Sequence, residues 1–222
     1  TVTVEGNTRI DASGAAGGGE ILIGGGWQGQ DTRLANAQTT TVTRGAVLDA
    51  SATDNGRGGT VVAWADGHTR FQGQVRARGG EQGGDGGRVE TSGKQTLDAR
   101  GARVDTRAPL GRTGDWLLDP AIMTIVGGSA PPPPASPSSV YETDLESATA
   151  NVTVSATDSI QVLGTFGGNA VTLPSNISLT LETTGTSGGG TSIDLMTSGQ
   201  PISFNTSGSA NLTISAASGN IK

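Results

Sequence analysis

The chain has 222 residues, of which 37 are glycine, and it carries a formal net charge of −6. Cysteine is absent and histidine occurs once, which excludes disulfides, thiolate zinc sites and histidine metal clusters. Up to Arg112, 12 arginines and one lysine face 12 acids, while the remainder carries −7, so neither half has the basic surplus that nucleic-acid binding requires.

A repeated pair of strands fills the first half of the chain. The first strand of the pair has four similar copies, at residues 9–13, 47–51, 74–78 and 103–107. A glycine-rich turn and a second apolar strand follow each copy. The second strands are anchored by Ile21, Val61, Val89 and Trp116, at intervals of 40, 28 and 27 residues. We interpret the long first interval as an insertion, Trp27 to Gln38, in a repeat of about 28 residues.

Such a repeat of short strands and glycine turns is typical of a β-solenoid. Alternation within each strand gives one apolar face, which a single coil cannot bury but a stack of coils can. Stacking would place Asp11, Asp49, Arg76 and Asp105 in one outward-facing column. Arg76 separates two acids there, and exposed pairs of this kind contribute roughly 0–1 kcal/mol each.

The middle of the chain interrupts the repeat. Residues 127–139 include four consecutive prolines, which cannot join a strand ladder, so we expect a protruding loop or linker. The S-x-x-E spacing of Ser139 and Glu142 predicts a short helix near residues 139–149.

Looser repeats follow this interruption. Similar phrases begin at Asn151, Asn176 and Asn211, which predicts further coils. We therefore divide the chain into three parts: β-helix coils at 1–126, a Pro-rich loop or linker at 127–139, and a short helix followed by more coils at 140–222. No stretch approaches the ~18 consecutive apolar residues of a membrane helix, so we do not expect a membrane-spanning protein.

Several glycine-rich motifs resemble those of large secreted exoproteins of the filamentous-haemagglutinin type. They are residues 19–29, 79–94, 104–109 and 114–120. The resemblance implies an all-β, right-handed parallel β-helix, exported by two-partner secretion through a partner outer-membrane pore transporter. It also implies a secreted protein, extracellular or on the bacterial cell surface. Members of the family act in cell adhesion, biofilm cohesion, haem acquisition and toxin delivery.

The chain begins at Thr1 and ends in a repeat-like phrase, so we expect it to be a segment of a longer protein. Targeting signals, and the parts that engage the partner pore transporter, would then lie outside it.

Few side chains are candidates for function, and we assign no catalytic, cofactor-binding or metal-binding residue. Trp27 is a candidate ligand contact because aromatic faces suit carbohydrates, and Arg33 is the only cation in the same insertion. We interpret Trp64 and Trp116 as inward or corner-packing residues, and His68 as a solvated turn residue. Candidate glycosylation sites are the asparagines of the N-x-S/T sequons, Asn151, Asn176, Asn205 and Asn211.

From these features we expect a non-enzymatic shaft segment of a large secreted adhesin, a virulence-type surface protein that mediates cell adhesion or biofilm matrix cohesion. Polysaccharides, host glycans or further copies of the chain are its expected partners. One alternative is a polysaccharide-degrading β-helix enzyme, which needs clustered carboxylates with Arg or Lys bases in a cleft. Another is the stalk of a contact-dependent toxin delivery exoprotein, which would share the same shaft.

Overall fold

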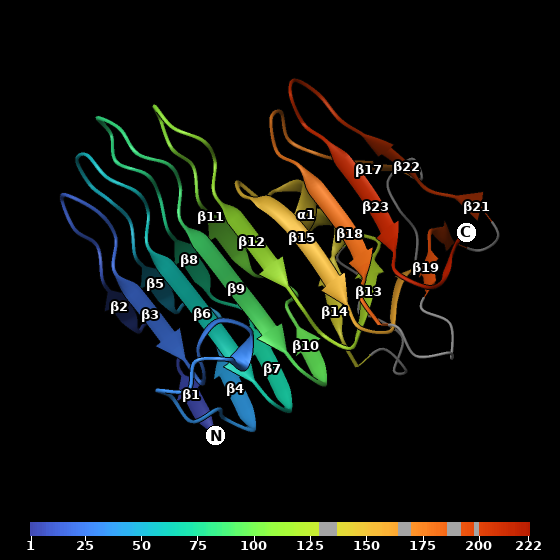
Figure 1. The fold of residues 1–222 in the computed structure, drawn as a ribbon, viewed down its shortest axis with the longest axis horizontal. Coiled ribbons are helices and arrows are strands. Elements are labelled where there is room, and N and C mark those ends of the chain that lie inside the picture. The colour runs from blue at the N-terminus through green and yellow to red at the C-terminus, as the bar shows by residue number, and fades with distance from the viewer. Residues whose placement is uncertain (129–136, 164–169, 186–191, 198–199) are drawn as a thin grey trace.

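The computed structural model describes residues 1–128, 137–163, 170–185, 192–197 and 200–222 (Figure 1). The described chain is nearly all β, and its strands form long parallel sheets stacked into a parallel β-helix with one short helix. This confirms the predicted fold class. The four prolines at 131–134, part of the expected protruding loop or linker, lie outside the described residues.

Three sheets form the sides of the stack among the described residues. Sheet A has the order β1-β4-β7-β10-β14-β13-β16-β19-β24. Its strands are β1 (Val2–Val4), β4 (Thr39–Val42), β7 (His68–Phe71), β10 (Thr96–Asp98), β13 (Ile122–Val126), β14 (Ser139–Tyr141), β16 (Ser159–Leu163), β19 (Ser192–Asp194) and β24 (Asn220–Ile221). Sheet B consists of β2 (Arg9–Asp11), β5 (Val47–Asp49), β8 (Gln74–Arg76) and β11 (Arg103–Asp105).

Sheet C runs from the first coil to the last. Its strands are β3 (Glu20–Ile23), β6 (Thr60–Ala65), β9 (Arg88–Gly93), β12 (Asp115–Leu118), β15 (Asn151–Ala156), β18 (Leu179–Thr183) and β23 (Leu212–Ala216). Two small pairs complete the described strands: parallel β17 (Ala170–Thr172) with β22 (Ser203–Asn205), and antiparallel β20 (Met196–Thr197) with β21 (Gln200–Pro201).

Each of the first coils passes through sheet A, then sheet B, then sheet C. Side-chain hydrogen bonds between stacked coils join residues 27 or 28 positions apart in the middle of the stack. The separation is 40 positions between the first two coils and 33 between the last ones. The predicted period of about 28 therefore describes the steps from β6 to β9, from β9 to β12 and from β15 to β18 in sheet C, whereas the steps from β3 to β6, from β12 to β15 and from β18 to β23 are longer.

The predicted anchors of the second strands lie in one column of sheet C. Ile21 pairs with Val61, Val61 with Val89, and Val89 with Trp116, and all four side chains are buried in the core. The ladder continues through β15 and β18. Because every strand keeps this register, the inward faces of successive coils join into one apolar core.

Glycine is required where the coils approach most closely, just before sheet C. A Cβ atom on Gly87 would lie 2.1 Å from the carbonyl oxygen of Gly59, and one on Gly59 would lie 2.0 Å from that of Gly19. The glycine-rich turns between sheets B and C consequently stack side by side (Figure 1). Gly19 belongs to the first coil, and a Cβ atom on it would have the Ala12 carbonyl oxygen as its nearest neighbour, 3.2 Å away.

The predicted helix is shorter than expected. Residues 139–141 form β14, which inserts between β10 and β13, and α1 (Glu142–Glu146) begins only afterwards. The proposed Ser139–Glu142 cap is therefore wrong. Asp144 serves this end of the helix instead, because its carboxylate accepts the backbone N–H of Tyr141, the residue before the helix, at 3.4 Å. The same carboxylate also accepts the backbone N–H of Gly101 at 2.7 Å. Nothing in the described ranges is a helix long and apolar enough to cross a membrane.

Helix α1 lies between β11 and β17 and continues the side of the stack that sheet B begins (Figure 1). Leu145 is fully buried in the common core. The Glu146 carboxylate accepts the backbone N–H of Thr172, the last residue of β17, at 2.7 Å. The helix thus closes the core where the strand pattern of sheet B stops.

Two further expectations need correction. Val152 pairs with Leu179, so the phrase beginning at Asn176 is aligned two residues away from its predicted place. The two-residue shift leaves the same face inward. Sequence reasoning also missed sheet A in the first half of the chain. His68 therefore begins strand β7 and is not a turn residue, although its side chain is exposed as predicted.

Candidate functional site

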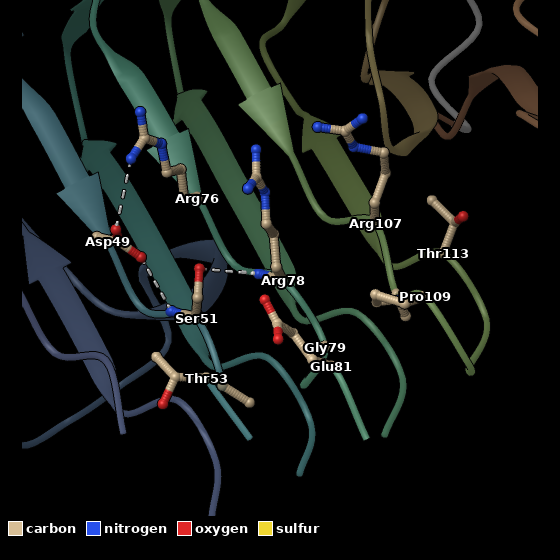
Figure 2. A pocket seen from close by; sticks show the side chains of 12 residues that line it. Asp49, Ser51, Thr53, Arg76, Arg78, Gly79, Glu81, Arg107, Pro109 and Thr113 are labelled. Atoms are coloured by element: carbon tan, nitrogen blue, oxygen red, sulfur yellow. Dashed lines mark hydrogen bonds and ion pairs between the residues drawn. The ribbon is translucent and has the colours of Figure 1, made fainter. Parts of the chain in front are cut away.

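A groove of about 600 Å³ lies on the outer side of sheet B and the turns that follow it (Figure 2). Asp49 and Ser51 come from one coil, Arg76 and Arg78 from the next, and Arg107 from the one after. The side chains of the three arginines lie along the same side of the groove (Figure 2). The groove is therefore assembled from equivalent positions of successive coils.

The register of sheet B produces this arrangement. Asp11 pairs with Asp49, Asp49 with Arg76, and Arg76 with Asp105, which confirms the predicted column. The expected exposure of the whole column is wrong, because Asp49 and Asp105 are only 6% and 9% exposed. Neighbouring arginines cover these two carboxylates and bind them.

Asp105 is shared by two arginines. Its carboxylate accepts Arg107 Nη2 at 2.8 Å and Arg78 Nε at 2.6 Å. Burial alone would raise the pKa of Asp105, but the hydrogen bonds from Arg107 and Arg78 outweigh it and hold the pKa below the ordinary value. Asp105 is therefore an anion at neutral pH.

Arg76 is the least satisfied cation of the groove. Its Nε is buried and has no hydrogen-bond partner among the described residues. Its Nη1 is 3.9 Å from Asp49 Oδ2, and its Nη2 is 3.5 Å from Gln74 Oε1. The side chains of Arg78 and Arg107 are 44% and 57% exposed. Guanidinium groups have five N–H donors each, so the groove retains donor capacity beyond its internal ion pairs.

The predicted insertion folds over the outer face of sheet C. The chain leaves β3 at Ile23, makes the 3₁₀ turn η1 (Trp27–Gly29), and enters β4 at Thr39. Gly25 and Gly29 pack against the Trp64 ring, where a Cβ atom on either would lie 2.5–2.6 Å from ring atoms. Trp64 is thus buried beneath the insertion and does not join the core as Trp116 does.

The two candidate ligand contacts of the insertion have different partners. The Arg88 guanidinium lies over the Trp27 ring, 4.7 Å from its centroid. Arg33 instead forms an ion pair with Asp31 at 2.6 Å. Hydrogen bonds from the Arg33 side chain and backbone N–H lower the pKa of Asp31 to about 2. The structure therefore does not join Trp27 and Arg33 into one cluster, and their role in ligand contact stays a prediction.

Sequence reasoning missed a buried acid beneath the same insertion. Glu90 is fully buried, and its Oε2 accepts the backbone N–H of Gln28 at 2.7 Å. Its Oε1 has no partner among the described residues. Burial raises the pKa of Glu90 to about 7, and the nearby Asp119 adds to the effect while Arg88 opposes it. The repeat pattern marks Glu90 as outward-facing and gives no sign that an insertion covers it.

The sequon asparagines differ in their surroundings. Asn151 is half-buried: its Nδ2 donates to the Thr113 carbonyl and its Oδ1 accepts the Ser178 N–H, both at 3.1 Å. The other three are exposed, namely Asn176, Asn205 and Asn211. Glycosylation of all four stays a prediction, and at Asn151 it would require the loss of these hydrogen bonds.

Comparison with known proteins leaves the family open. No family model matches the chain, and no match is found among curated proteins. The likeness to filamentous-haemagglutinin-type exoproteins consequently depends on the sequence motifs alone.

Proposed function

We propose that the chain is a non-enzymatic shaft segment of a large secreted adhesin that mediates cell adhesion or biofilm matrix cohesion at the bacterial surface. The main support is sheet C, whose strands stay in register from β3 to β23. A parallel ladder of this kind adds about 4.8 Å of length with each coil. Export through a partner pore transporter would depend on parts of the protein outside this segment.

The chemistry of the groove favours this proposal over the β-helix enzyme. Glycoside hydrolysis requires a carboxylic acid that is protonated at the working pH. Asp105 cannot fill that role, because the two arginines keep it ionised. Glu90 has the raised pKa that such an acid needs, but it is buried under the insertion on sheet C. The toxin-delivery stalk shares this shaft and differs from the adhesin only beyond the segment.

Surface display tests the proposal. The chain would be inserted into the passenger of an autotransporter on a non-adherent laboratory bacterium, and attachment to epithelial monolayers and to polysaccharide-coated plates would be counted. We expect more attachment than with the Gly87→Ala variant, whose coils should not stack properly. If attachment to both surfaces were no higher than with the Gly87→Ala variant, an adhesive role would be contradicted. New reducing ends or unsaturated products released from polysaccharides by the purified chain would instead favour the enzyme.

A further inference from the structure

We propose that the groove on sheet B binds a carboxylated polysaccharide of the polyuronate class, lying along the axis of the stack, a ligand assignment that rests on the proposed adhesive function. Arg76, Arg78 and Arg107 would contact its carboxylates. The planar guanidinium fork matches a carboxylate in two parallel hydrogen bonds, which makes arginine the suited residue for this group.

The internal ion pairs leave these arginines able to bind. One carboxylate, that of Asp105, serves both Arg78 and Arg107. The contacts of Arg76 are long, 3.9 Å from Nη1 to Asp49 Oδ2 and 3.5 Å from Nη2 to Gln74 Oε1, and its buried Nε has no partner among the described residues. Burial without a partner is costly for a polar group, so a ligand that supplies acceptors beside Arg76 would gain affinity.

The periodicity of the groove favours a polymer over a single small anion. Arg78 donates its backbone N–H to Ser51 Oγ at 3.2 Å, and the backbone of Gly79 donates to the Arg107 carbonyl, so these residues belong to stacked coils. Equivalent atoms of stacked strands are about 4.8 Å apart, close to the length of one sugar residue in an extended chain. Ser51, Arg78 and Arg107 therefore offer one donor group per sugar along the axis.

The remaining lining selects for a sparsely charged ligand with apolar faces. Ala52, Ala108 and Pro109 line the groove beside the arginines and can contact the C–H faces of sugar rings. The acids Asp49 and Glu81 also line it, which disfavours a dense polyanion. Isolated carboxylates, one per sugar, suit this mixture better than the closely spaced charges of a heavily sulfated chain.

Binding of polygalacturonate to the whole chain, measured by biolayer interferometry, tests the assignment. Fully methyl-esterified polygalacturonate is the matched probe, since it keeps the backbone and lacks the charge. Arg76→Ala should weaken binding at least about tenfold, as expected for a hydrogen bond to a charged group. Arg76→Lys, which keeps the charge but lacks the fork, should lose part of the affinity. Arg70→Ala on sheet A removes the same charge elsewhere and should bind like the wild type.

The outcomes separate this assignment from the proposed shaft. Equal binding of the esterified probe, equal loss in Arg76→Ala and Arg70→Ala, or tighter binding of heparin would overturn the carboxylate assignment. Circular dichroism of each variant shows whether lost binding reflects lost folding. If Arg76→Ala does not fold, the affinity of Arg76→Lys decides whether the guanidinium contacts the ligand. If the chain did not bind polygalacturonate but displaying bacteria still attached, the ligand assignment would be refuted and the proposed shaft function would stand. If the chain bound polygalacturonate and cleaved it, the groove would be a binding site as proposed, but the proposal of a non-enzymatic shaft would be refuted.

Discussion

Replacing Gly87 with alanine would test the close stacking of coils before sheet C. The new Cβ atom would lie 2.1 Å from the Gly59 carbonyl oxygen, whereas real Cβ atoms essentially never approach within 3.0 Å of another heavy atom. The two coils must therefore separate by about 1 Å, a shift that forfeits a large part of their van der Waals contact. The hydrogen bond from Arg88 N–H to Gly59 O at 3.0 Å, which joins the two coils, would be strained.

Each buried backbone group left unsatisfied costs about 1–3 kcal/mol. We therefore expect Gly87→Ala to lower the free energy of unfolding by about 3 kcal/mol. Gly19→Ala is the matched control, because a Cβ atom at the same column position in the first coil would have its nearest neighbour at 3.2 Å. It should change stability by less than about 1 kcal/mol, partly because alanine restricts the unfolded chain.

Urea unfolding followed by circular dichroism and by fluorescence of the buried Trp116 measures both variants. Hydrogen exchange adds local information, since stacked coils can open separately. Protection should fall mainly in β6 and β9, on either side of the new methyl group. Equal unfolding midpoints for Gly87→Ala and Gly19→Ala would refute the stacking explanation for this glycine column.

Three other variants address the acids and the helix. Glu90 keeps its proton up to a pKa of about 7 in the folded chain against an ordinary value of 4.5, so the wild type should lose about 3 kcal/mol of stability between these pH values and then level off. Glu90→Gln should remove that slope in urea titrations at several pH values; an unchanged slope would contradict the assignment. Asp105→Asn leaves Arg78 and Arg107 without their shared anion and should lower the thermal midpoint at neutral pH. Because folding lowers the pKa of Asp105, the difference from wild type should shrink only as the pH falls from the ordinary Asp value toward the lower folded value, and a pH-independent difference would contradict this ion pairing. Leu145→Ala opens a cavity beneath α1 and should cost about 2–5 kcal/mol in denaturant unfolding; a loss below about 1 kcal/mol would mean that the helix does not close the core.

The coil architecture was predictable from sequence because sheet C carries strong inward anchors. Val61, Val89 and Trp116 recur at nearly constant spacing, and their column could be identified without coordinates. Sheet A was missed because its early strands are short and polar on their outer side. Strand β10, for example, contributes only Leu97 to the buried core between two half-exposed residues. Such a segment carries too little alternation to be told from a turn.

The groove was partly visible in the same repeats. The repeats predict the column of Asp49, Arg76 and Asp105, and Ser51, Arg78 and Arg107 lie two positions later in the same repeats. Following both columns would have placed the arginines side by side. The burial of Glu90 had no comparable signal, because the segment that covers it belongs to a distant coil and reaches it by a backbone N–H.

The column on sheet B also bears on how such a chain can change length during evolution. Coils that contact only their neighbours can be gained or lost as whole units, since the ladder closes again in register. Loss of the coil that contains Arg76 would be an exception, because it would bring the carboxylates of Asp49 and Asp105 face to face. The stacked acids Asp11 and Asp49 are tolerated because Arg9 binds both carboxylates. Descendants that lack the Arg76 coil should therefore have replaced one of the two acids or gained a bridging arginine of this kind, so that the length of the rod and the charge of this column change together.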